Sequence, residues 1–123
     1  MHGTIAQASR DSALAKSRAE LLLQYGFVVD TFATPNAMSK ACEKQRFDLL
    51  IIGHSLEYQS RQEIREAFRN LNPGSPVLQL TTVAEASSDT GANYNFCVSE
   101  GPGALVKCIE KILKTRSASA SNI

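Results

Sequence analysis

The unbroken apolar run at residues 49–52, Leu-Leu-Ile-Ile, constrains the fold more than any other segment of the chain. A continuous aliphatic run of this length indicates a strand buried on both faces, and such strands belong to parallel sheets covered by helices on each side. Gly53, His54 and Ser55 follow directly. Ligands of open α/β sheets bind just beyond the carboxyl ends of the strands, so these three residues are the first candidates for a functional site.

The rest of the chain alternates strand-like and helix-like segments. Helices are predicted after Asp11 or Ser12, after Thr34, from the Ser-x-x-Glu pair Ser60 and Glu63, and from Pro102. Between the fourth and fifth strands, residues 83–93 contain few apolar residues and predict a short, weak helix or a loop. The predicted strands cover residues 4–8, 27–32, 47–52, 77–80 and 95–98.

This order predicts an α/β fold of the flavodoxin-like, doubly wound type. We expect a five-stranded parallel sheet in the order 2-1-3-4-5, with right-handed crossovers and a shortened fourth helix. Residues 1–114 are predicted to form one domain. Residues 115–123 (TRSASASNI) are of low complexity, and we expect a flexible C-terminal tail there.

Composition excludes several classes of partner. The 123 residues carry a formal net charge of +1 with scattered basic residues, so neither nucleic acid nor an anionic membrane is an expected partner. No segment approaches the length of a membrane span, and the N-terminus does not resemble a signal peptide. The three cysteines fit no zinc pattern and are expected to be buried free thiols. We therefore expect a cytoplasmic protein.

The sequence Gly53-His54-Ser55-Leu56-Glu57 resembles the nucleophile elbow of α/β-hydrolases, Gly-x-Ser-x-Gly. The match stops at Glu57, which replaces the second glycine that the tight turn needs. The two histidines of the chain are His2 and His54, so none follows Ser55 to complete a triad in the order of that family. A small enzyme or ligand binder at this turn is kept as an alternative, and the primary expectation is that the protein is not an enzyme.

A second resemblance covers nearly the whole chain, from about residue 4 to residue 113. Residues 47–52 (FDLLII) resemble the strand that precedes the phospho-accepting aspartate in receiver domains of two-component response regulators. Residues 72–81 (NPGSPVLQLT) resemble the turn and fourth strand of those domains, and residues 26–29 (GFVV) resemble their second strand. The chain is therefore similar to receiver domains.

The resemblance implies that the phosphorylation pocket is degenerate. The family's acidic pair, which holds Mg²⁺, falls on Ser9 and Arg10, with Asp11 one residue later. The phospho-accepting aspartate falls on Gly53. The Thr or Ser after the fourth strand is present as Thr81, and the lysine after the fifth strand falls near Ser99. We expect no metal, no cofactor and no aspartyl phosphate at this position.

Two side chains at the same edge are candidates for other roles. His54 lies beside the vacated acceptor position and is an alternative phospho-acceptor or ligand. Arg10 is a candidate anion-binding residue, assisted by the N–H groups at the start of the first helix.

The sequence thus predicts a stand-alone pseudo-receiver that acts in two-component or phosphorelay signal transduction by phosphorylation-independent protein interaction. No output domain accompanies it, so we expect it to act in trans on signalling proteins such as a histidine kinase or a regulator. A homodimer is an alternative, although the shortened segment 83–93 changes the face with which receivers pair.

Overall fold

A parallel sheet of five strands forms the centre of the molecule. The computed structural model describes residues 3–85 and 90–121. The strand order is β2-β1-β3-β4-β5, which confirms the predicted flavodoxin-like topology. The strands are β1 (Gly3–Ala8), β2 (Phe27–Phe32), β3 (Leu49–Ile52), β4 (Val77–Thr81) and β5 (Tyr94–Cys97).

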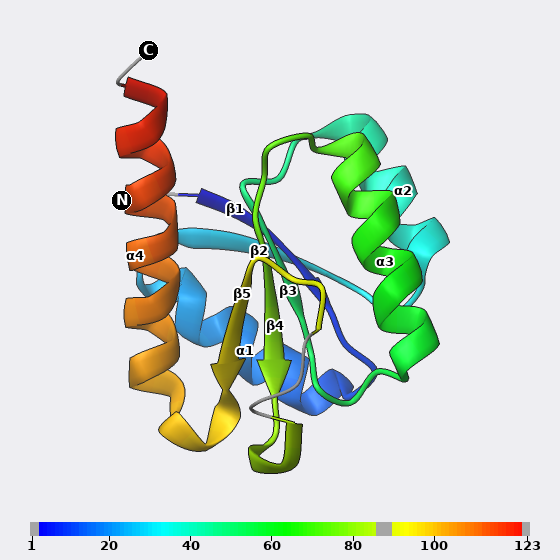
Figure 1. The fold of residues 1–123 in the computed structure, drawn as a ribbon, viewed down its shortest axis with the longest axis vertical. Coiled ribbons are helices and arrows are strands. Elements are labelled where there is room, and N and C mark those ends of the chain that lie inside the picture. Colours follow the sequence, from blue (N-terminus) through cyan, green and yellow to red (C-terminus); the bar gives the residue numbers. More distant parts are fainter. Residues whose placement is uncertain (1–2, 86–89, 122–123) are drawn as a thin grey trace.

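Helices cover both faces of this sheet. The α-helices are α1 (Ser12–Gln24), α2 (Pro35–Lys44), α3 (Tyr58–Leu71) and α4 (Pro102–Ser121), and two short 3₁₀ helices are η1 (Val83–Glu85) and η2 (Val98–Glu100). Figure 1 shows α1 and α4 on one side of the sheet and α2 and α3 on the other. The functional edge lies where the strands end and the helices begin.

Local sequence explains where the first two helices begin. Asp11 caps α1 by accepting a hydrogen bond from the Leu14 N–H at 3.0 Å, and Thr34 caps α2 by accepting one from Ala37 at 3.2 Å. Gly26 follows α1 with φ of 90°, the left-handed conformation that favours glycine after a helix. The chain is thereby turned directly into β2.

The core has two parts, one on each face of the sheet. Alternate side chains of each strand point to opposite faces, so Ile51 and Leu78 pack with α1 and α4, whereas Leu50 and Ile52 pack with α2 and α3. Leu49, Leu50, Ile51 and Ile52 are all fully buried, as the apolar run predicts. The three cysteines are free thiols, and each is half-buried where the sequence predicted burial.

The connection between β4 and β5 is short of regular structure. Among the described residues its one helical turn is η1, and residues 86–89 lie outside the part of the chain that the structure describes. This connection has no apolar stripe in its described part. Its backbone carbonyls accept hydrogen bonds from arginine side chains of α3 instead. The predicted shortening of the fourth helix is thus seen in the described part of the connection.

Two predicted boundaries differ from the structure. Helix α4 continues through Ser121, so the predicted domain end at residue 114 does not coincide with the end of a helix. Neither Gly nor Pro interrupts residues 115–121, and Ala118 and Ala120 favour helix. Helix α3 begins at Tyr58 with Glu57 as N-cap, so Ser60 and Glu63 do not open it. Residues 122–123 of the predicted tail lie outside the described residues.

Candidate functional site

All of the predicted pocket positions lie at one edge of the sheet. Ser9, Arg10 and Asp11 follow β1, Gly53 and His54 follow β3, Thr81 ends β4, and Ser99 lies in η2 just after β5. Because the strands are parallel, their carboxyl ends meet at this edge. The structure therefore brings the predicted positions to one edge of the sheet, and their contacts decide what this edge can do.

The ends of β1 and β3 are closed against each other. Gly53 donates its backbone N–H to the Ala8 carbonyl at 2.8 Å. A Cβ atom placed on Gly53 would lie 3.2 Å from that carbonyl oxygen and 3.4 Å from Ser9 Oγ. The φ angle of Gly53 is not positive, so its backbone conformation does not require glycine. The short distance to an added Cβ atom is what disfavours a larger residue here. Position 53 thus has no side chain, and an added Cβ atom would meet the Ala8 carbonyl oxygen closely.

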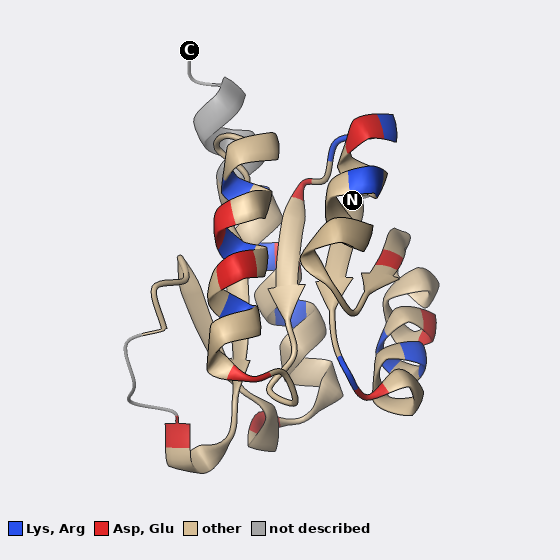
Figure 2. Ribbon diagram, turned by 90° about the vertical axis from the view of Figure 1, so that its right-hand side faces the viewer, with Lys and Arg blue, Asp and Glu red and all other residues tan. Residues whose placement is uncertain are grey.

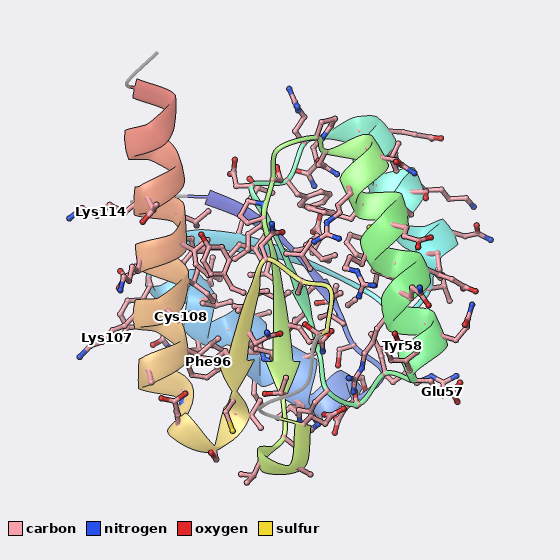
Figure 3. The ribbon with its side chains drawn as sticks, viewed as in Figure 1. Glu57, Tyr58, Phe96, Lys107, Cys108 and Lys114 are labelled. Atoms are coloured by element: carbon pink, nitrogen blue, oxygen red, sulfur yellow. The ribbon has the colours of Figure 1, made fainter. Side chains whose placement is uncertain are left out.

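Arg10 joins the two loops above this contact. Its backbone N–H donates to Ser55 Oγ at 3.4 Å, and its guanidinium lies 3.3 Å from Glu57 Oε1. Both side chains are more than half exposed, so the ion pair contributes at most about 1 kcal/mol. Figure 3 shows Glu57 beside Tyr58 at the start of α3. Arg10, which was proposed from the sequence as an anion-binding residue, therefore already pairs with the Glu57 carboxylate.

The remaining pocket positions have structural contacts of their own. Asp11 is occupied as the cap of α1. Thr81 is buried, and its hydroxyl donates to the Phe96 carbonyl on β5 at 3.4 Å. Ser99 is exposed and lies 3.1 Å from Cys97 Sγ. The Ser9 hydroxyl donates to the Asp11 carbonyl at 3.3 Å, so Ser9 and Thr81 each have a backbone carbonyl as hydrogen-bond partner.

His54 and Ser55 have separate surroundings. The Ser55 hydroxyl accepts the Arg10 N–H, whereas His54 lines a cavity between α1 and α4. The backbone carbonyl of His54 accepts a hydrogen bond from Arg61 at 2.6 Å. Within the described residues no hydrogen bond joins His54 to Ser55, and this geometry gives no support to a serine nucleophile activated by its neighbour.

The cavity beside His54 is the feature that sequence reasoning missed. It has a volume of about 380 Å³ and lies over Leu80 and Phe96, between the N-terminal halves of α1 and α4. Its wall is largely aliphatic and aromatic, and the lining residues with polar side chains are Ser17, Arg18 and His54. Figure 3 shows Phe96 on the side of the sheet that α4 covers. The cavity forms where two helices that are far apart in sequence pack together, so no local sequence motif predicts it.

Arg18 is a buried cation in the wall of this cavity. It is 8% exposed, and its Nη1 atom donates to Gln7 Oε1 at 2.6 Å. Gln7 is fully buried on β1 and donates in turn to the Ala15 carbonyl and to Thr31 Oγ1. Burial lowers the pKa of Arg18 from its ordinary value, and the charge of Asp11 acts in the opposite direction.

A ridge of three arginines on α3 holds the connection between β4 and β5; we call Arg61, Arg65 and Arg69 the arginine ridge. Arg65 is buried and donates to the Thr90 carbonyl at 2.7 Å, and Arg69 donates to the Gly91 carbonyl at 2.8 Å. The four-residue spacing places all three on one face of α3. This spacing was the available sequence signal, since an arginine face can bind carbonyls where an apolar stripe is missing.

Arg61, the first residue of the arginine ridge, also forms an ion pair in which it is the more buried partner. Arg61 Nη1 lies 3.0 Å from Glu85 Oε2, with side chains 12% and 35% exposed. Burial favours the neutral form of Glu85, but hydrogen bonds from Arg61 and Thr82 and the Arg61 charge outweigh it, so the pKa of Glu85 lies below its ordinary value. Arg61 also donates to the Leu56 and His54 carbonyls, which ties η1 to the loop after β3.

Two broader features of the described chain bear on function. Within residues 3–85 and 90–121, no three His, Cys, Asp or Glu side chains gather as metal ligands. Along the same residues, no helix combines the length and apolar character needed to cross a bilayer. Figure 2 shows basic and acidic residues interspersed along α3, the helix nearest the viewer.

Comparison with known proteins finds similar folds. No protein-family model matches the sequence, and no curated protein shows significant similarity to it. A CheY-like receiver domain protein of Methanospirillum hungatei JF-1 is 20% identical, with a TM-score of 0.77 over 97% of this chain and 99% of that chain. CheY4 of Vibrio cholerae is also 20% identical, with a TM-score of 0.75 over 91% and 99%.

A response regulator receiver protein from Burkholderia phymatum is 16% identical, with a TM-score of 0.75 over 91% of this chain and 95% of that chain. The three solved structures share one fold with this protein across almost its full length. At these identities the likeness establishes the fold and leaves function to the residues.

Proposed function

We propose that this protein is a pseudo-receiver that acts in two-component-type signal transduction through phosphorylation-independent binding to other signalling proteins. The observation that carries the proposal is at Gly53, which has no side chain and where an added Cβ atom would lie 3.2 Å from the Ala8 carbonyl oxygen. The fold supplies the family's scaffold, and the residues at its functional edge differ from those that phosphoryl transfer requires.

Phosphoryl transfer to a carboxylate needs an acceptor oxygen and a cation that neutralises the charge developing on the phosphoryl group. Gly53 has no side-chain oxygen. Ser9 and Arg10 stand where carboxylates would hold Mg²⁺, and a guanidinium repels a divalent cation. The protein therefore acts as a binding module rather than as an enzyme, with no metal or cofactor and with a cytoplasmic location.

The binding face that we favour is the one formed by η1, β5 and α4. Receiver domains pair with partners through the equivalent elements, and this face has exposed apolar residues: Val83 is 72% exposed and Tyr94 is 40% exposed. The β5 strand is also the outer edge of the sheet, so its backbone is available for pairing. The arginine ridge fixes Glu85 and residues 90–93 beside this face without help from a phosphate.

Affinity capture from the native lysate, read by mass spectrometry, tests the proposal when it includes a matched pair of variants. Tyr94→Ser removes an exposed aromatic from the favoured face, and Tyr58→Ser removes one from the start of α3, where Figure 3 shows it projecting outward. We expect wild-type protein and Tyr58→Ser to recover the same histidine kinase or regulator, and Tyr94→Ser to lose it.

Recovery should be equal in EDTA and in Mg²⁺ with a small phosphodonor. Recovery that depends on Mg²⁺ and the phosphodonor would contradict phosphorylation independence. Recovery of no signalling protein under any condition would contradict the assignment to signal transduction.

A further inference from the structure

The cavity between α1 and α4 has the features of a small-molecule site. Its volume of about 380 Å³ falls in the range of ligand pockets, and its wall is mainly apolar, with a few polar groups at one side. The apolar wall consists of Leu14, Leu21, Leu80, Phe96, Val98 and Leu105. Such a wall favours a hydrocarbon or aromatic body over a polar one.

The buried guanidinium of Arg18 favours a negatively charged ligand in the cavity. A guanidinium has five N–H donors, and the hydrogen bond recorded for Arg18 among the described residues is the one from Nη1 to Gln7. Gln79 Oε1 is the buried side-chain polar atom without a partner among those residues. Arg18 lines the cavity, and no other hydrogen bond of its guanidinium is recorded among the described residues. A carboxylate would satisfy these donors and offset the cost of burying the charge.

The start of α4 adds a second attraction for an anion. Gly101 and Pro102 line the cavity, and Gly101 has no side chain with which to cap the helix. Cβ atoms added to Gly101 or Gly103 would meet nothing within 4 Å, so the helix N-terminus is open. Its unpaired N–H groups and dipole favour a negative charge. Arg18 and the start of α4 thus lie at the wall of the same apolar cavity.

We propose that this cavity binds a small amphiphilic monocarboxylate, with its apolar body against Leu80, Phe96 and Leu105 and its carboxylate held by Arg18. His54 lies at the same wall and is placed to contact the ligand. Binding is non-covalent and does not rest on the signalling role, since the cavity lies beneath α1 and α4 and not at the Gly53 contact. Ligand binding would couple the packing of α4 to the edge of the sheet.

Titration of the full chain with octanoate, octan-1-ol and octylammonium, followed by amide NMR shifts and calorimetry, tests this site. We expect octanoate to bind at least tenfold more tightly than octan-1-ol and to shift residues that line the cavity. Arg18→Met should reduce octanoate affinity to that of octan-1-ol. Arg18→Lys should retain part of the preference, and Arg10→Met, which removes an exposed arginine at the same edge, should change nothing.

Ser17→Trp provides a variant that does not disturb the buried Arg18–Gln7 pair. Ser17 is exposed on α1 and lines the cavity, so an indole there should obstruct it and abolish octanoate binding while the fold is kept. If Arg18→Met does not fold, this variant and the comparison of octanoate with octan-1-ol still decide the proposal. Equal affinities for the three probes, binding that survives Ser17→Trp, or no shifts at millimolar octanoate would each overturn it.

Discussion

The Gly53 backbone N–H and the Ala8 carbonyl are joined by a hydrogen bond of 2.8 Å, and this bond sets the distance between the loops after β1 and β3. Ser9 Oγ lies where it would be 3.4 Å from a Cβ atom at position 53. A side chain at position 53 would therefore have to displace the Ala8 carbonyl oxygen by a few tenths of an ångström.

Replacing Gly53 with aspartate should destabilise the protein and should not create a phosphorylation site. The new Cβ would lie 3.2 Å from a strand carbonyl that has little freedom to move. Insertion into a packed site of this kind costs about 1–3 kcal/mol, and Gly53→Ala should cost less than Gly53→Asp. Urea unfolding of both variants measures which of the two loses more stability. A Gly53→Asp protein as stable as wild type that gains a phosphoryl group in Mg²⁺ would contradict this.

Removing Arg65 should loosen the connection between β4 and β5. Arg65→Met keeps the aliphatic stem but loses the 2.7 Å hydrogen bond to the Thr90 carbonyl, so we expect about 1–3 kcal/mol less stability. Amide hydrogen exchange should quicken at Gly91 and Ala92 and stay unchanged in α1. Arg46→Met, which alters an exposed arginine before β3, is the matched control. Equal exchange in both variants would show that the arginine ridge does not hold this segment.

Acid should weaken the same connection through Glu85. Its pKa in the folded protein lies below the ordinary value of 4.5, so its stabilising contribution is complete above 4.5 and is lost as the pH falls through the folded pKa. Melting temperatures recorded on both sides of that value should fall less steeply toward acid in Glu85→Gln than in wild type. Identical pH profiles would mean that the pair with Arg61 contributes nothing measurable.

Asn72 should be one of the more sensitive polar positions for stability. It is 1% exposed, and its Oδ1 atom accepts the Phe47 N–H at 2.9 Å just before β3. Asn72→Ala would leave that buried N–H without a partner, at a cost of about 1–3 kcal/mol. Asn36→Ala, at an exposed position on α2, should change stability by less than about 0.5 kcal/mol. Chemical denaturation of the two variants compares them directly.

The sequence was sufficient for the topology because each strand and helix has a local signal. The run at residues 49–52 predicts β3, Asp11 and Thr34 begin their helices as caps, and Gly26 ends α1. One capping signal gave a wrong helix start. The Ser60–Glu63 pair has the spacing of a capping box, but α3 begins at Tyr58. A local motif of this kind does not decide a boundary when the packing of the preceding turn favours an earlier start.

The sequence predicted that the pocket positions lie at one edge of the sheet, but it did not predict their contacts. Positions 9, 10, 53 and 81 were found by resemblance, whereas the ion pair of Arg10 with Glu57 joins residues far apart in sequence. The hydrogen bond between Arg18 and Gln7 and the cavity beside it depend on how α1 packs on β1 and α4. Contacts between elements require the assembled fold.

Intact-mass measurement after incubation with Mg²⁺ and acetyl phosphate tests the central claim most directly, with a phosphorylatable receiver domain as positive control. We predict a phosphoryl adduct on the control protein and none on this one, because Gly53 offers no acceptor oxygen and Ser9 and Arg10 offer no carboxylate pair for the metal. A phosphoryl adduct mapped to His54, Asp11 or Asp48 would contradict phosphorylation-independent function and establish an unusual acceptor.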